Sequence, residues 1–146
     1  MKLTEVQDEW IKDSAIDELN LGRESIRVPT LHAKYLTSLS KVKLQLRKVE
    51  SDYYNTRRLK YRYYRGEMTR EELAVLEWDQ FQGNKPLKNE MDEFLQCDKD
   101  LIELQDKVEY FKTVIFTLEQ ILRSINSRTW DIKTAVEYMK FTNGMM

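Results

Sequence analysis

The sequence is poor in residues that end helices and in residues that perform catalysis. Its 146 residues include only four glycines and two prolines, so few tight turns are possible and long helices are favoured over a sheet. The single cysteine, Cys97, excludes an intrachain disulfide and favours a reducing compartment. The single histidine excludes any site that needs two imidazoles. These absences predict an all-α fold.

Signals of enzymes, cofactors and membranes are also missing. No C-x-x-C, H-E-x-x-H, G-x-x-x-x-G-K or G-x-S-x-G sequence occurs. The acidic residues between Glu90 and Asp100 have the oxygens that a divalent cation needs, but helical carboxylates among lysines are more typical of a solvated face. No apolar run approaches the ~20 residues that span a bilayer, and the N-terminus lacks a signal peptide's apolar core. We therefore predict no enzyme activity, cofactor, metal or membrane segment.

What the sequence has instead is the apolar spacing of helices. Apolar residues at positions 3, 6, 10 and 11 predict a helix over residues 3–12. Residues 20–28 are predicted to be irregular, so that Pro29 lies in the first turn of a long helix that ends at Gly66. Thr69 and Glu72 form a T-x-x-E capping box, which predicts a short second helix.

A more regular heptad pattern follows. Pro86 is predicted to open a long helix, whose heptad frame extends back to Leu87 and makes Cys97 a small core residue. Residues 127–129 are predicted to break this helix before a short C-terminal helix. The apolar residues of this helix cover more of its surface than one heptad stripe, which favours self-association over a tight monomeric bundle. The predicted oligomerisation residues are Leu101, Leu104, Val108, Phe111, Ile115, Leu118, Leu122, Ile125, Trp130, Ile132 and Val136.

Charge is unevenly distributed along the chain, although the net charge is only −1. Residues 41–65 hold nine basic and two acidic residues, a net of +7, whereas residues 66–110 hold five basic and thirteen acidic residues, a net of −8. The end of the basic segment is also rich in tyrosine. Cations neutralise phosphates and tyrosine rings stack on unpaired bases, so this mixture favours single-stranded nucleic acid. The candidate binding residues are Tyr54, Arg57, Arg58, Lys60, Tyr61, Arg62 and Arg65.

Two other classes remain open from the residues alone. A coiled-coil adaptor that binds only protein would show no salt-dependent affinity for oligonucleotides. A membrane-surface helix would bind anionic vesicles, but the basic stretch lacks the strong Leu/Phe face that such helices need. The basic stretch itself can also be a plain helix end, whose tyrosines pack inward and whose arginines extend into solvent.

Several short stretches, in this order, resemble a known family. They are Leu31-x-x-Lys34-Tyr35-Leu36, Leu46-Arg47-x-Val49-Glu50, Tyr63-Tyr64-x-Gly66, Asp98-Lys99-Asp100 and Ile125-x-Ser127-Arg128. Their order and spacing, nearly end to end, are similar to those of the UvsY family, the recombination mediators of T4-like phages. A basic pair spaced K-x-R precedes the Tyr-Tyr-x-Gly in that family, and here it reads Arg58-Leu59-Lys60.

The resemblance implies an accessory protein of the infected host's cytoplasm. Family members bind single-stranded DNA as ring-like homo-oligomers of about six or seven subunits. They help a RecA-like phage recombinase to load onto strands covered by the phage single-strand-binding protein. We accordingly expect one helical domain over residues 1–146. Within it, residues 1–85 are expected to carry the basic DNA-binding helix, and residues 86–146 the oligomerisation helices.

Overall fold

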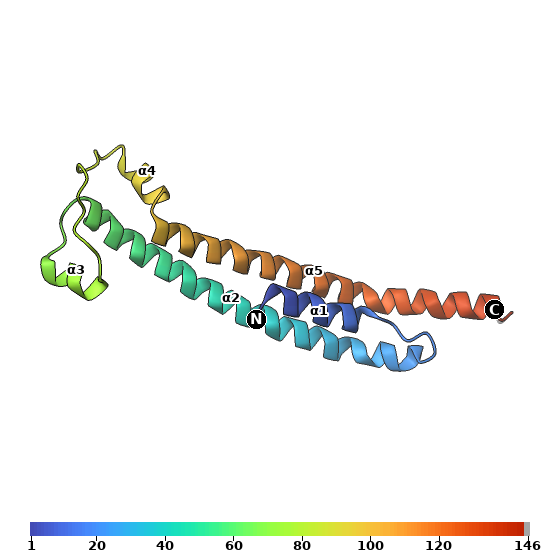
Figure 1. Cartoon of the computed structure of the whole chain (residues 1–146). Coiled ribbons are helices and arrows are strands. Elements are labelled where there is room, and N and C mark those ends of the chain that lie inside the picture. Colours follow the sequence, from blue (N-terminus) through green and yellow to red (C-terminus); the bar gives the residue numbers. More distant parts are fainter. Residues whose placement is uncertain (145–146) are drawn as a thin grey trace. The chain divides into compact units, whose positions relative to one another are not determined.

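The computed structural model describes residues 1–144 and is all-α over that range (Figure 1). The prediction of long helices is confirmed, because two helices of 44 residues account for most of the chain. None of the helices in this range is long and apolar enough to cross a membrane. The elements are α1 (Leu3–Ser14), α2 (Leu21–Tyr64), α3 (Arg70–Leu76), α4 (Met91–Gln96) and α5 (Lys99–Thr142).

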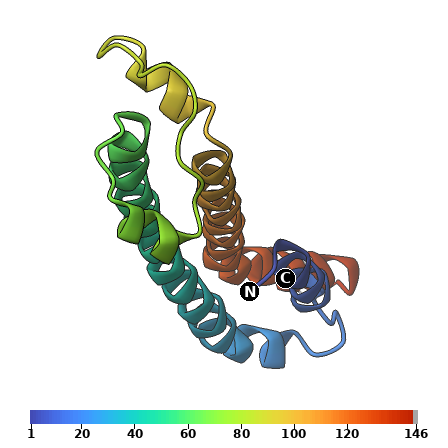
Figure 2. The same ribbon diagram turned by 60° about the vertical axis from the view of Figure 1, so that its left-hand side comes forward.

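The chain forms two compact units, and each long helix contributes to both. The first unit comprises residues 1–45 together with residues from Phe111 onward, and the second comprises residues 46–110. In the first unit, α1 packs on the N-terminal half of α2 and the C-terminal half of α5 (Figures 1 and 2). The ring of Trp10 meets that of Tyr35 edge-on at 5.6 Å. The buried core residues are Val6, Leu31, Tyr35, Leu39, Val42, Val114, Leu118, Ile121, Leu122 and Ile125.

The start of α2 differs from the sequence prediction. Residues 20–28 are not irregular, because α2 begins at Leu21 and Pro29 lies inside it. A proline there removes one backbone hydrogen bond and strains the preceding turn. Contacts to other elements hold that turn in place: Glu24 binds Arg128 at 2.8 Å, and Arg27 binds Asp13 at 2.9 Å. Tertiary contacts therefore outweigh the local preference.

The predicted break at residues 127–129 and the short C-terminal helix are also wrong, since α5 is continuous to Thr142. The reason is Arg128, whose side chain is 4% exposed. Its guanidinium donates to the carbonyls of Ser14 and Ala15 at 3.1 and 3.0 Å and to the carboxylate of Glu24. Helical geometry places Arg128 on the buried face between Ile125 and Ile132, so these contacts require the helix to continue.

Within the second unit, the end of α2 and the start of α3 lie where the sequence predicts them. Gly66 ends α2 in the left-handed conformation, with φ +69°. Its N–H donates to the carbonyl of Tyr63 at 3.1 Å, and that of Glu67 donates to the carbonyl of Arg62 at 3.0 Å, which is the usual glycine-terminated helix end. Thr69 then caps α3, since its hydroxyl accepts from the N–H of Glu72 at 3.2 Å.

The backward extension of the heptad frame from Leu101 to Leu87 is wrong. Pro86 opens no helix; α4 starts at Met91, and Asp98 separates it from α5. The carboxylate of Asp98 accepts from the N–H groups of Asp100 and Leu101 at 3.0 and 3.1 Å, so it caps α5. Cys97 is consequently exposed rather than part of the core, and Leu87 is 64% exposed. Met91, Leu95 and Leu101 form the core of this unit instead.

Candidate nucleic-acid interface

One face of α2 in the second unit presents cations and a tyrosine to solvent. Arg47, Tyr54 and Arg58 are spaced i, i+7 and i+11, which places them on the same side of the helix, with Ser51 between them and Lys48 beside them. All five are exposed, Tyr54 by 64%. Within residues 1–144, these three cations have no acidic partner. We call these five residues the α2 ridge.

The candidate residues named from the sequence do not include the first half of this ridge. They begin at Tyr54, because tyrosines and arginines alternate most densely from there onward. Arg47 and Lys48 stand two turns earlier, without an aromatic neighbour between them and Tyr53. Helical spacing from Arg58 back to Arg47 was the signal that identifies them as members of the same face.

Three of the predicted cations lie in surface ion pairs. Arg57 lies 3.6 Å from Asp92, Arg62 binds Glu72 through both guanidinium nitrogens at 2.9 and 3.1 Å, and Arg65 binds Glu67 at 2.9 Å. All three arginines keep more than a third of their side chain exposed. Surface ion pairs of this kind contribute roughly 0–1 kcal/mol, so exchanging the carboxylate for a phosphate costs little.

Lys60 differs from these arginines, because its side chain is only 9% exposed. Its ammonium lies 3.2 Å from the carboxylate of Asp98, 2.8 Å from that of Asp100 and 4.2 Å from the ring centre of Trp78. The sequence contained a signal for this burial. Positions 46, 49, 53, 56 and 60 continue the core heptad of α2, so Lys60 falls on the inner side of the helix and Arg58 on the outer side.

Asp98 connects Lys60 to the end of α2. The hydroxyl of Tyr64 donates to its carboxylate at 2.6 Å. Burial alone would raise the pKa of Asp98, but the hydrogen bonds from Tyr64 and Leu101 and the charge of Lys60 outweigh it and hold the pKa below its ordinary value. Burial, followed by the hydrogen bond to Asp98, raises the pKa of Tyr64 above the ordinary range. Asp98 is therefore ionised and Tyr64 protonated at neutral pH.

The two predicted stacking residues lie in different surroundings. Tyr54 is exposed, with its ring edge-on to Tyr53 at 5.5 Å. Tyr61 is half-buried and packs on the cluster of Met91, Leu95 and Leu101. Of the two, only Tyr54 has a ring that a base can reach without movement of the core.

Comparison with known proteins identifies the kind of protein that carries this ridge. The family described as "Recombination, repair and ssDNA binding protein UvsY" matches residues 9–145. The chain belongs to the UvsY family. It is therefore a recombination, repair and single-strand-binding mediator and not an enzyme.

Relatives of known sequence and structure support the UvsY assignment over the full length. The recombination protein UvsY of Enterobacteria phage T4 is 26% identical over 144 residues, which are 99% of each chain. Two crystal structures of the bacteriophage T4 recombination mediator protein UvsY, lattice types II and IV, superimpose with TM-scores of 0.83 and 0.84 at 25% identity. The type II alignment covers 98% of both chains, and the type IV alignment covers 97% of this chain and 99% of the other.

Most of the predicted oligomerisation residues of this UvsY family member lie within its own fold. Leu101, Val108, Leu118, Leu122, Ile125 and Ile132 are buried in the isolated chain. Leu104, Phe111, Ile115 and Val136 are half-buried. Trp130 differs from all of them, because it is 68% exposed. The contact of these residues with another subunit stays a prediction.

Proposed function

We propose that single-stranded DNA binds along the α2 ridge, with Arg47, Lys48 and Arg58 at the phosphates and Tyr54 stacked on a base. The observation that carries this proposal is that these cations are exposed on one helix face, with no acidic partner among the residues that the structure describes and with the tyrosine among them. Phosphates attract such cations whatever the base sequence, and an exposed aromatic ring stacks on any base. The mediator therefore requires no base-reading motif.

Arg57, Arg62 and Arg65 extend the ridge toward the end of α2 in this proposal. Their carboxylate partners are exchanged for phosphates when the strand arrives. Tyr61 packs on the core of the second unit in this proposal, and Lys60 supports the helix from within through Asp98 and Asp100. The family's K-x-R pair implies instead that Lys60 contacts the strand directly, and this stays a prediction. Measurements of stability and of DNA binding on a Lys60 variant distinguish the two roles.

Replacing Arg47 and Arg58 together by glutamine should lower the affinity for an oligothymidylate strand by about tenfold or more at about 0.1 M salt. The slope of log affinity against log salt should flatten by roughly 0.7 for each phosphate contact that is lost. Fluorescence anisotropy titrations at several salt concentrations measure both. A matched control is Lys12→Gln with Lys140→Gln, which removes two exposed cations outside the ridge. An unchanged slope in the ridge variant would remove the DNA site from this face.

The proposal includes a ring-like homo-oligomer of about six or seven copies, so that several ridges meet one strand and raise avidity by ~10²–10⁴. Its contact surface would use the exposed apolar residues of α5 in the first unit. Phe116, Trp130, Tyr138 and Phe141 are each at least 60% exposed. Trp130 and Phe141 share a helix face, since they are spaced i and i+11.

Trp130→Ser with Phe141→Ser should therefore reduce the mass of the assembly in light scattering and weaken DNA binding with it. Deleting residues 127–146 would be a poorer test, because it also removes the buried Arg128 and Ile132. Ile26→Ser is the matched control, as Ile26 is 81% exposed on α2. If the double variant kept its full mass, this surface of α5 would not be the interface.

As a mediator, the protein would act on strands already covered by the phage single-strand-binding protein and load the RecA-like recombinase there. The ATPase of that recombinase on covered strands reports loading. We expect the wild type to shorten the lag before hydrolysis. The Arg47→Gln, Arg58→Gln variant should leave the lag long, because loading in this proposal requires the ridge to hold the strand.

A further inference from the structure

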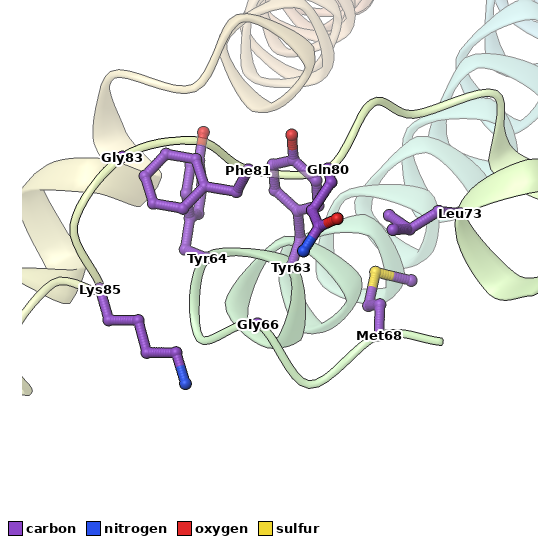
Figure 3. A pocket seen from close by; sticks show the side chains of 9 residues that line it. All are labelled: Tyr63, Tyr64, Gly66, Met68, Leu73, Gln80, Phe81, Gly83 and Lys85. Carbon is purple, nitrogen blue, oxygen red and sulfur yellow. The ribbon is translucent and has the colours of Figure 1, made fainter. Parts of the chain in front are cut away.

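A cavity of about 260 Å³ lies in the second unit, between the end of α2 and the loop that follows α3 (Figure 3). Tyr63, Tyr64 and Phe81 line it with aromatic rings, and Gly66 leaves its floor without a side chain. Pockets for drug-sized ligands start at ~300 Å³, so this volume fits a smaller, flat group. The Tyr-Tyr-x-Gly stretch of the sequence thus lines a cavity that the α2 ridge does not include.

The rings are held in place before any ligand arrives. The hydroxyl of Tyr63 donates to the carbonyl of Asp79 at 2.6 Å, and that of Tyr64 donates to Asp98 at 2.6 Å. The ring of Phe81 is edge-on to Tyr64 at 5.1 Å and tilted against Tyr63 at 5.9 Å. Because their positions are fixed by these contacts, little side-chain entropy is lost when a flat group enters.

Cations lie on one side of this cavity. Lys85 lines it and also lines an adjoining cavity of about 240 Å³, together with Arg65, Gly66, Glu67 and Pro86. Lys85 has no acidic partner within residues 1–144. A Cβ at Gly66 would lie 3.1 Å from Cε of Lys85, so the glycine leaves room for the lysine between the two spaces. Figure 3 shows Lys85 and Gln80 on opposite sides of the rings.

A nucleotide matches these two parts of the site, since its flat base suits the aromatic rings and its anionic phosphate suits the cations. We propose that the aromatic cavity accepts one unstacked base of the bound strand, while Lys85 and Arg65 hold a phosphate of that nucleotide. This inference rests on the proposed function, because it names a second contact point for the strand bound at the ridge. Arg65 exchanges Glu67 for the phosphate, and the amide of Gln80 offers a donor and an acceptor to any base.

The test compares an oligothymidylate with an abasic strand of equal length, which keeps the phosphates and lacks the bases. Full-length wild type should bind the abasic strand at least ~5-fold more weakly, since base–aromatic stacking is lost. Phe81→Leu should weaken binding of the oligothymidylate and leave the abasic strand unaffected, so that the difference between the two affinities shrinks to the part that stacking on Tyr54 contributes. Melting temperatures establish that this variant is folded.

A matched lysine pair tests the phosphate half of the proposal without touching the core. Lys85→Gln should weaken binding of both strands and flatten the salt slope by roughly 0.7. Lys88→Gln should do neither, because Lys88 is exposed in the same segment but lies outside both cavities. If Lys85→Gln behaves like Lys88→Gln, or if folded Phe81→Leu keeps the wild-type preference for bases, the cavity is not a nucleotide site.

The experiments on the cavity can fail independently of the experiment on the α2 ridge. If Arg47→Gln with Arg58→Gln weakens both strands while Phe81→Leu changes nothing, the proposed function stands and the cavity proposal fails. If the ridge variant has no effect while Phe81→Leu removes the preference for bases, the strand binds at the cavity and the ridge proposal fails.

Discussion

Replacing Arg128 by methionine should lower the free energy of unfolding by about 3–5 kcal/mol, the cost of removing one partner from a buried ion pair. The side chains of Arg128 and Glu24 are 4% and 8% exposed and lie 2.8 Å apart. Without the guanidinium, Glu24 keeps Arg27 at 3.7 Å as its one cationic partner in the described part of the chain, and the carbonyls of Ser14 and Ala15 lose their donor. Urea unfolding followed by circular dichroism measures the loss.

Two comparison variants show how much of the lost unfolding free energy comes from burial of the ion pair and how much from loss of a charge. Lys34→Met breaks a pair with Asp13 at 2.7 Å, but Lys34 is 43% exposed, so it should cost at most about 1 kcal/mol. Adding Glu24→Leu to Arg128→Met should recover some of the stability, since the unpaired buried carboxylate is removed. Equal losses for Arg128→Met and Lys34→Met would mean that the Arg128 contact is unimportant in solution.

The second large effect is expected at Lys60, where methionine should cost about 3 kcal/mol of unfolding free energy. The value is at the lower end for a buried pair because Asp98 keeps its hydrogen bonds from Tyr64, Asp100 and Leu101. Asp100 is 52% exposed and is rehydrated easily. Thermal and urea unfolding measure the change, with Arg58→Gln as the control that stays within about 0.5 kcal/mol of wild type.

When DNA binding is measured instead of stability, Arg58→Gln should have the larger effect and Lys60→Met the smaller one. Arg58→Gln should flatten the salt dependence, whereas Lys60→Met, below its unfolding temperature, should keep the wild-type slope. A stable Lys60→Met protein with a flattened slope would show that Lys60 contacts the strand. That result would support the direct role that the family's K-x-R pair implies.

Local signals in the sequence predicted the elements that local contacts define. The end of α2 requires only Gly66 and its neighbours, and the start of α3 requires only the Thr69 cap, so both were predicted correctly. The N-terminal extension of α2 past Pro29 and the continuity of α5 at Arg128 depend on residues about a hundred positions away. A pattern within one window contains no information about such partners.

The candidate site divides in the same way. The outward face of Tyr54 and Arg58 follows from helical spacing. Lys60 was predicted to bind the strand, although an extension of the heptad frame through positions 53 and 56 puts it on the inner face. The ion pairs of Arg57 and Arg62 did not follow from the sequence, because α4 and α3 contribute Asp92 and Glu72 from segments whose positions no periodicity specifies. The aromatic cavity was also missed, since it requires Phe81 to return from a loop onto Tyr64.

The division into two units determines an order of events during synthesis. Residues 46–110 are one continuous stretch, nested inside a unit that needs both ends of the chain. Their contacts, such as Tyr64 with Asp98 across 34 positions, are available as soon as this stretch has left the ribosome. Arg128 and Glu24 are 104 positions apart in the sequence. The apolar faces of α1 and of the N-terminal half of α2 therefore stay exposed to solvent until most of α5 has been synthesised. During that interval the nascent chain is most exposed to aggregation, and a second copy emerging nearby offers the same apolar faces.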